Sequence, residues 1–172
     1  MKEKLIEILK SYTIDKELVY EFFNNQNLNT NSLNEVRKKT TLYPCCDLDI
    51  IGVYPKINKD ILVDYRVRAP KINNIYDSLI YIHETIHGLI LETNLNMEFK
   101  DDEYEELLPM IYEDKFIEYL LVNKIYDVKN IYDEYIITKY NDKDSDERYI
   151  KARSVINSFS NNKVKVKKRY IK

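Results

Sequence analysis

Residues 79–91, LIYIHETIHGLIL, constrain the fold more than any other part of the chain. Their apolar side chains recur at helical spacing and cover much of a helix circumference, which predicts a helix over residues 74–92 that runs through the interior. Three ionisable side chains lie within it: His83, Glu84 and His87. Because an unpaired buried polar group costs on the order of 1–3 kcal/mol, the surrounding fold must supply partners for them.

The spacing of the only two histidines in the chain predicts a metal site. Residues i and i+4 lie on one helix face, so the imidazoles of His83 and His87 can converge on one cation. The carboxylate of Glu84 points to the side of that axis, where it reaches a metal-bound water as a general base. The alternative is an ordinary polar stripe, but chance produces this pattern only roughly once in a thousand such chains. We therefore expect one zinc ion here.

A third zinc ligand must come from another part of the chain. A catalytic zinc takes three protein ligands and keeps a fourth position for water. No His or Cys follows His87, so a downstream carboxylate is the remaining option. Residues 101–121 offer five glutamates: Glu103, Glu105, Glu106, Glu113 and Glu118. Their spacing alone does not choose among them.

The whole chain, residues 1–172, is expected to form a single α+β domain, since this length is short for two independent cores. Two segments rich in β-branched and aromatic residues, 48–54 and 61–67, predict a small antiparallel hairpin within residues 46–68. Apolar periodicity predicts helices elsewhere. Their expected ranges are 2–10, 15–24, a start near Ser32, 74–92, 103–125, 129–140 and 145–158.

These elements group into N-terminal helices (1–40), the hairpin, metal-site helices (73–125), C-terminal helices (129–159) and a basic tail (160–172). The tail alternates basic and apolar residues, which predicts an edge strand or a frayed end. Such a run also suits contact with an acidic partner, although a solvated terminus is its commoner meaning.

Composition and charge argue against several classes of protein. A net charge of −2 gives no reason to expect a nucleic-acid partner. Cys45 and Cys46 are adjacent, which disfavours a disulfide-stapled secreted fold. The N-terminal residues lack the pattern of a signal peptide, and no apolar run approaches the roughly 20 residues that span a bilayer. We expect a cytoplasmic protein without a membrane partner.

Residues 46–122 resemble the thimet oligopeptidase and oligoendopeptidase F family of zinc metallopeptidases. That family carries a strand of the type ILLNY, a short acidic turn and a helix with HExGH, and here ILVDY at residues 61–65 precedes the helix with HETIH. Further on, the family places a zinc-binding Glu seven residues before a second Glu and then EYL. This chain has Glu106, Glu113 and then IEYLL.

The resemblance implies a zincin-like, mostly helical peptidase in which Glu106 is the third zinc ligand and Glu113 orients a ligating histidine. It also implies a peptide or protein substrate that pairs along one hairpin strand, either 48–54 or 61–67. Two departures leave the ligands intact: Ile86 replaces a family glycine, and Glu106 follows His87 by 19 residues, a shorter spacing than usual.

A third departure concerns the oxyanion, because family members use a further histidine there and this chain has none to spare. A tyrosine, an arginine or a backbone N–H must then stabilise it. Tyr149 is our choice among four residues in the right part of the chain: Tyr140, Arg148, Tyr149 and Arg153. Two rival hypotheses are a catalytically inactive zincin-like protein that acts as a binding or regulatory module, and a structural metal site with four protein ligands.

Overall fold

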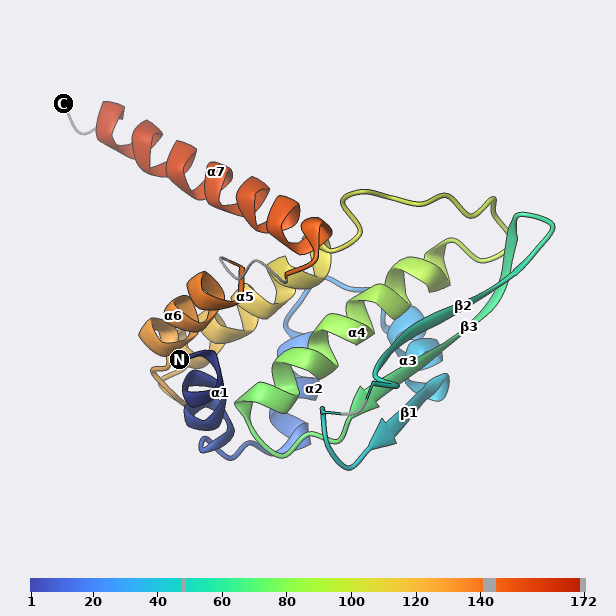
Figure 1. Cartoon of the computed structure of the whole chain (residues 1–172), viewed down its shortest axis with the longest axis horizontal. Coiled ribbons are helices and arrows are strands. Elements are labelled where there is room, and N and C mark those ends of the chain that lie inside the picture. Colours follow the sequence, from blue (N-terminus) through green and yellow to red (C-terminus); the bar gives the residue numbers. More distant parts are fainter. Residues whose placement is uncertain (48, 141–144, 171–172) are drawn as a thin grey trace.

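Helix α4 (Ile75–Thr93) runs through the centre of the molecule, with a small sheet on one side and several helices on the other (Figure 1). The computed structural model describes residues 1–47, 49–140 and 145–170, and the side chains as far as residue 159. Ile75, Leu79, Ile82 and Ile86 of α4 are all buried, at helical spacing. The expected interior helix over 74–92 is confirmed to within one residue, and the chain has the expected α+β composition.

Three short helices precede the sheet: α1 (Lys2–Lys10), α2 (Lys16–Asn24) and α3 (Thr30–Lys38). The side chain of Asp15 accepts a hydrogen bond from the backbone N–H of Glu17 and so caps α2. Asn29 caps α3 in the same way, accepting from the N–H of Ser32. The predictions for the first two helices are confirmed, and the third begins just ahead of the expected Ser32.

Within the described residues the sheet has three strands in the order β1-β3-β2: β1 (Thr40–Tyr43), β2 (Gly52–Asn58) and β3 (Ile61–Pro70). β2 and β3 form the expected antiparallel hairpin, whose two turn residues, Lys59 and Asp60, both have positive φ. The predicted bounds are wrong, because the hairpin occupies 52–70 and residues 49–51 form no strand; residue 48 lies outside the described residues. Pro55 is tolerated inside β2 because β2 is an edge strand.

Strand β1 is not predicted by the sequence. It is four residues long and pairs in parallel with the second half of β3, from Thr40 opposite Val67 to Tyr43 opposite Pro70. β1 therefore covers the second edge of β3 only at residues 67–70. On the same edge, residues 60–62 bond to residues 96–99, so only a short stretch of residues 61–67 stays open. Among the described residues, β2 is the hairpin strand with an open edge along its whole length.

Three helices follow α4: α5 (Leu107–Val122), α6 (Lys129–Tyr140) and α7 (Glu147–Tyr170). The prediction for 129–140 is confirmed, whereas that for 103–125 is wrong at its start. Pro109 explains the difference, because in a helix from residue 103 its ring would clash with the carbonyl of Glu105. A start at Leu107 puts Pro109 in the first turn, where a proline is tolerated.

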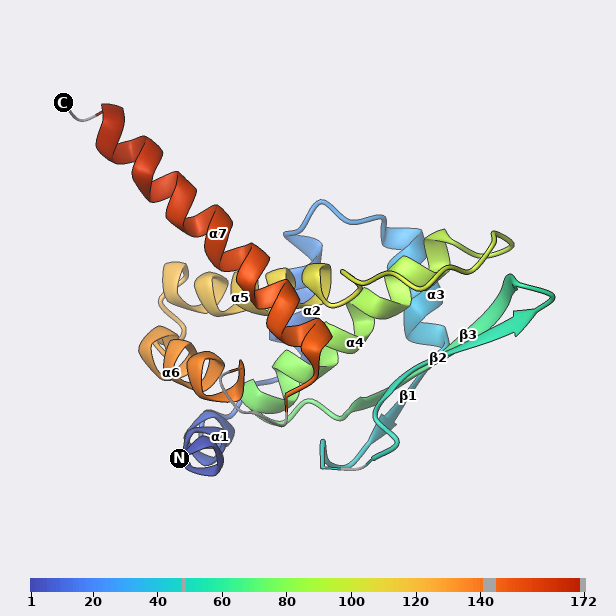
Figure 2. The ribbon, with the colours of Figure 1, turned by 45° about the horizontal axis from the view of Figure 1, so that its top comes forward.

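Helix α7 is longer than the expected 145–158 and projects away from the rest of the molecule (Figures 1 and 2). Its backbone is helical through Tyr170, so the predicted edge strand or frayed end is wrong for residues 160–170. Extending an existing helix gains one hydrogen bond per residue, which a local alternation of side chains does not overcome. The side chains of the basic tail beyond residue 159, and residues 171–172 altogether, lie outside the described part.

Close packing fixes the height of α4 above the sheet. A Cβ built on Gly88 would lie 2.8 Å from Cγ1 of Val36 in α3 and 3.0 Å from Cγ2 of Val67 in β3. Only a glycine lets the backbone of α4 approach both neighbours so closely. In the part of the chain that the structure describes, no helix has the length and apolar character that crossing a membrane requires.

Candidate metal centre

Three donor atoms meet where α4 passes the start of α5. His83 and His87 lie on one face of α4, with their Nε2 atoms 3.2 Å apart. Glu106, at the N-cap position of α5, places Oε2 2.7 Å from Nε2 of His83 and 3.1 Å from Nε2 of His87. His83 and Glu106 are buried and His87 is half-buried. These three side chains could together hold a metal ion.

The separations of these atoms suit a small cation. Ligands about 2.0–2.1 Å from a tetrahedral zinc lie about 3.3 Å from one another, close to the distances observed here. Burial opposes a charge on His83, but Glu113 and Glu106 raise its pKa to about 10. Burial also opposes a charge on Glu106, yet hydrogen bonds with His83 and His87 lower its pKa to about 2. The donor set therefore favours positive charge at the point where a cation would bind.

Glu113 contacts the other end of the His83 ring. It is buried in α5, and its Oε1 lies 3.5 Å from Nδ1 of His83. The two candidate carboxylates are thus separated by position, since Glu106 faces both Nε2 atoms and Glu113 faces Nδ1 alone. A carboxylate at Nδ1 fixes the tautomer and the orientation of an imidazole whose Nε2 binds a metal. This is the arrangement that the family resemblance implies.

Glu84 lines a groove beside the donor atoms, together with His87 and Glu106. Burial raises the pKa of its carboxyl group, while the two neighbouring histidines act in the opposite direction. It is not one of the three converging donors, which leaves it available for proton transfer. Among the described residues no fourth donor joins this group, in contrast to the four ligands of a structural zinc site.

Tyr149, in the first turn of α7, covers the His83 side of the centre. Its ring is stacked on the imidazole of His83, with centroids 5.9 Å apart and planes 28° apart. It also lines the groove. Burial, followed by the charges of Glu106 and Glu84, raises the pKa of its hydroxyl, so the phenol stays protonated and able to donate a hydrogen bond.

The other three candidates for the oxyanion are engaged elsewhere or enclosed. Arg148 forms an ion pair with Glu105, and Arg153 forms a bidentate pair with Asp114. The hydroxyl of Tyr140 is buried without a hydrogen-bond partner and is absent from the groove lining. Tyr149 is thus the candidate that the structure brings to the groove.

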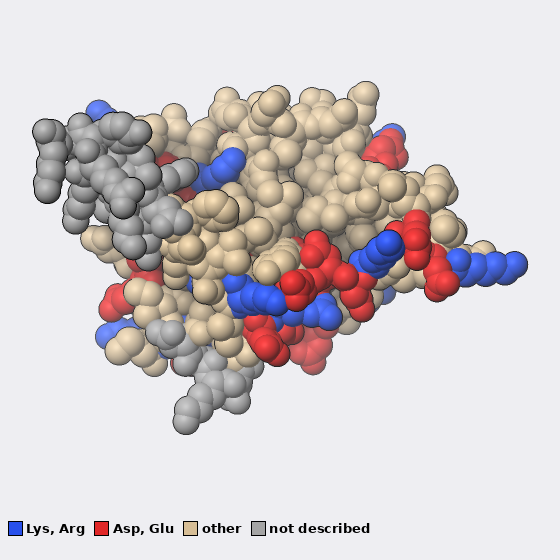
Figure 3. All heavy atoms as spheres, turned by 90° about the horizontal axis from the view of Figure 1, so that it is seen from above, with Lys and Arg blue, Asp and Glu red and all other residues tan. Residues whose placement is uncertain are grey.

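The remaining glutamates considered as ligands lie away from the donor atoms. Glu103 pairs with Lys151 at 2.6 Å, Glu105 pairs with Arg148, and Glu118 is exposed on α5. The first two pairs join α7 to the loop that precedes α5. Figure 3 shows acidic and basic side chains side by side in a band across this side of the molecule. Glu103 and Glu105 therefore help to hold α7, which carries Tyr149, against the loop before α5.

The groove beside the donors has a volume of about 630 Å³. One wall is the start of the edge strand β2, and the others are the second half of α4, the loop after it and the start of α5. Nine of its eighteen lining residues are apolar: Ile51, Val53, Pro55, Ile90, Leu91, Phe99, Leu107, Leu108 and Ile111. Of these apolar residues, only Ile51 and Val53 fall in a segment, 48–54, that the sequence predicted to contact a peptide. Pro109 was a usable signal in the sequence, because it determines where α5 starts. Leu107 and Leu108 lie at that start and line the groove.

Comparison of the chain with protein-family models, with curated proteins and with solved structures finds no match.

Proposed function

We propose that the chain is a zinc-dependent metallopeptidase with a zincin-like fold. The observation that carries the proposal is the convergence of His83, His87 and Glu106 beside a groove that Glu84 also lines. Two histidines and a carboxylate, with one position left for water, are a ligand set of catalytic zinc sites. The resemblance of residues 46–122 to the thimet oligopeptidase and oligoendopeptidase F family supports the same assignment.

Each polar group at the site has a distinct role in this proposal. Zinc would supply Lewis acidity, activating water and polarising the carbonyl of the peptide bond. Glu84 takes a proton from the attacking water and passes it to the leaving amine; its raised pKa helps it serve as both base and acid. Tyr149 donates a hydrogen bond from its phenolic O–H to the oxyanion as the tetrahedral intermediate forms. Glu113 holds the His83 ring in place.

The groove favours an extended peptide with apolar side chains. Because β1 and residues 96–99 cover most of the second edge of β3, β2 is the hairpin strand with the longer open edge for main-chain hydrogen bonds to a peptide. Gly52 and Val53 of β2 lie in the same groove lining as His87, so a peptide paired there passes the donor atoms. The apolar wall from α4 and α5 would receive its side chains.

Two measurements test the proposal together. Elemental analysis of the purified protein should find about one zinc per chain, and a fluorogenic peptide library should reveal cleavage. Glu84→Gln should retain zinc and lose at least about 100-fold in turnover, since general acid–base catalysis contributes that much or more. Glu118→Gln, an exposed change on α5, is the matched control. A folded protein that binds no zinc, or whose cleavage survives Glu84→Gln, would refute the proposal.

A further inference from the structure

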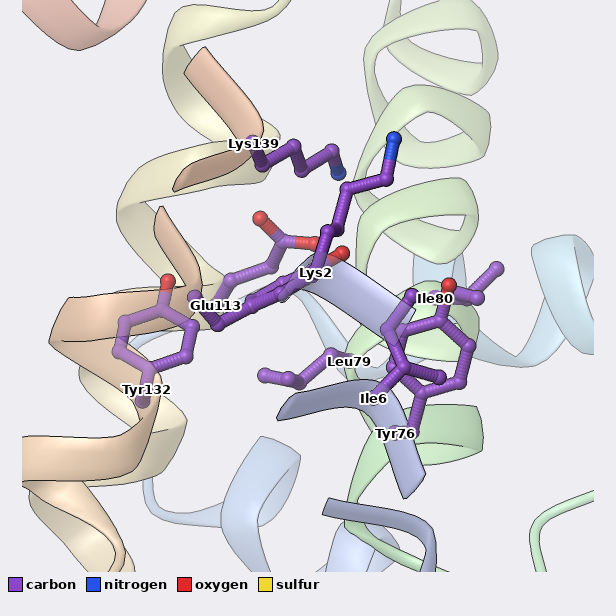
Figure 4. A pocket seen from close by; sticks show the side chains of 9 residues that line it. Lys2, Ile6, Tyr76, Leu79, Ile80, Glu113, Tyr132 and Lys139 are labelled. Carbon is purple, nitrogen blue, oxygen red and sulfur yellow. The ribbon is translucent and has the colours of Figure 1, made fainter. Parts of the chain in front are cut away.

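A cavity of about 150 Å³ lies between α1, α4, α5 and α6 and shares no lining residue with the groove. Glu113 lines this cavity and also contacts His83, so it connects the cavity to the metal centre. Three tyrosines and two lysines complete its polar lining, and Figure 4 shows Lys139 reaching into it from α6 beside the carboxylate of Glu113. The second lysine, Lys2, enters from α1.

The ammonium group of Lys139 is surrounded by aromatic rings. Its Nζ lies 5.6 Å from the ring centroid of Tyr135, 5.3 Å from that of Tyr140 and 5.6 Å from that of Tyr149. Cations are attracted to the faces of such rings, and the attraction grows when water is excluded. Burial lowers the pKa of Lys139, but Tyr140 and Glu113 more than offset this and raise it above its ordinary value. The side chain is therefore charged at neutral pH.

Lys139 approaches both side chains that flank the candidate ligand His83. Glu113 lies at Nδ1 of His83, and Tyr149 is stacked on its ring. The charge of Lys139 acts on the carboxylate of the first and on the ring of the second. We propose that Lys139 is a positioning residue for the metal centre, acting on the His83 imidazole through Glu113 and Tyr149.

The chemistry of a buried carboxylate explains why a cation is needed at this place. Glu113 is 6% exposed, and the N–H at Nδ1 of His83 satisfies only part of its hydrogen-bonding capacity. Without a positive charge in the cavity, the carboxylate would be poorly solvated and free to turn from His83. Lys2 and Lys139 both line the cavity, and the rings around Lys139 include Tyr149, which ties it to the metal centre. The charge of the Lys139 ammonium attracts the carboxylate of Glu113 in this cavity. The proposal concerns metal binding, so it stands whether or not the chain cleaves peptides.

The two histidines make a direct test practical, because the imidazole ¹⁵N spectrum of the full chain contains only two rings. His87→Gln assigns them. The variants are Lys139→Met, which removes the charge, and Lys139→Arg, which keeps it. Lys129→Met, an exposed change on the same helix, and Lys2→Met, a change in the same cavity, are the controls. The parent and the lysine variants are loaded with zinc for the spectra, whereas His87→Gln, which lacks a candidate zinc ligand, is compared with the metal-free parent. Zinc affinity is measured by competition with a chelator.

In Lys139→Met we expect zinc affinity to fall about 10-fold or more, as for other partners of metal-ligating histidines. The Nδ1 resonance of His83 should move more than that of His87, and Lys139→Arg should restore both properties. If Lys139→Met does not fold, Lys139→Gln takes its place. Unchanged affinity and spectra in a folded Lys139 variant would overturn the proposal, as would an equal effect of Lys2→Met or Lys129→Met.

Discussion

Oε1 of Glu113 lies 3.5 Å from Nδ1 of His83, at the opposite end of the imidazole from the Nε2 atom that faces Glu106. Two carboxylates therefore hold one ring from both ends. An N–H at Nδ1 directed to Glu113 leaves the lone pair of Nε2 for a cation. The position of each carboxylate thus assigns it a different effect on metal binding.

The first prediction compares how much Glu113 and Glu106 each contribute to zinc affinity. Glu113→Gln should weaken zinc binding about 10–100-fold, because it disturbs the orientation of a ligand. Glu106→Gln should weaken it by more than about 100-fold, because it replaces a charged ligand itself. Competition with a chelator measures both values. Glu105→Gln, next in sequence but paired with Arg148, is the control and should bind like the parent protein. The reverse ranking would show that Glu113 is the ligand.

The second prediction concerns the stability of the metal-free protein. The pKa of His83 is raised from 6.5 to about 10. Its contribution to the free energy of unfolding is therefore complete below pH 6.5 and is lost as the pH rises through 10. The pKa of Glu106 is lowered from 4.5 to about 2, so its contribution is complete above pH 4.5 and is lost as the pH falls through 2. The two contributions coexist in full between pH 4.5 and 6.5.

Chemical unfolding in the presence of a chelator measures this dependence. The difference in unfolding free energy between the parent protein and His83→Gln should shrink from pH 6.5 to pH 10, by at most about 1.4 kcal/mol per pH unit. Bound zinc should reverse this trend below pH 10, because a coordinated imidazole is neutral and proton competition weakens as the pH rises. A difference that grows with pH in the metal-free proteins would contradict the assignment.

The third prediction separates the hydroxyl of Tyr149 from its ring. Tyr149→Phe keeps the ring stacked on His83 and removes the only group that can donate to the oxyanion from this side chain. Removing one such donor typically lowers kcat 100- to 1,000-fold, on the order of 3 kcal/mol, with little change in KM or zinc content. Tyr104→Phe, at a more exposed place in the groove, is the control. Equal kcat in the parent protein and in Tyr149→Phe would show that another donor stabilises the oxyanion.

Only some residues of the candidate metal centre could be predicted from the sequence. His83 and His87 follow from helical spacing, because four residues is one turn, and the structure brings their Nε2 atoms together. Glu106 carries no such periodic signal, since it lies at the N-cap of α5 and not in its interior. The resemblance to a family, and not spacing, pointed to it. Lys139 gave no signal, because its place in the cavity depends on packing between helices far apart in sequence.

The same contrast holds for the fold. Helix α4 is apolar around most of its surface, so its length and burial follow from the pattern alone. Strand β1 is four residues long with an exposed Thr41 and Leu42, which leaves no alternation to read, and its partner is β3, across a long connection. Pro109 was a usable signal for the start of α5. The continuation of α7 through residue 170 depends on helix propagation over a basic, weakly patterned segment.

The fourth prediction concerns the apolar wall of the groove. Leu108 is 43% exposed on α5 and lines the groove. Leu108→Glu should lower kcat/KM for peptides with apolar side chains about 10-fold or more, since burying a leucine-sized group is worth about 1.5–3 kcal/mol. Zinc content should not change. Val122→Glu, an exposed change at the far end of the same helix, is the control. A uniform loss over polar and apolar peptides would argue against a wall that selects side chains.

The fifth prediction concerns Gly88 and the packing that supports the site. Alanine is favoured over glycine inside a helix by about 1 kcal/mol, but a Cβ on Gly88 would meet Cγ1 of Val36 at 2.8 Å. Since overpacking typically costs 1–3 kcal/mol, the two effects together should lower the free energy of unfolding of Gly88→Ala by up to about 2 kcal/mol. Val36→Ala removes the nearest clashing methyl, so in that background the cost of Gly88→Ala should fall by at least about 1 kcal/mol. A four-member double-mutant cycle by chemical unfolding measures this coupling, and purely additive effects would show that the contact with α3 does not set the position of α4.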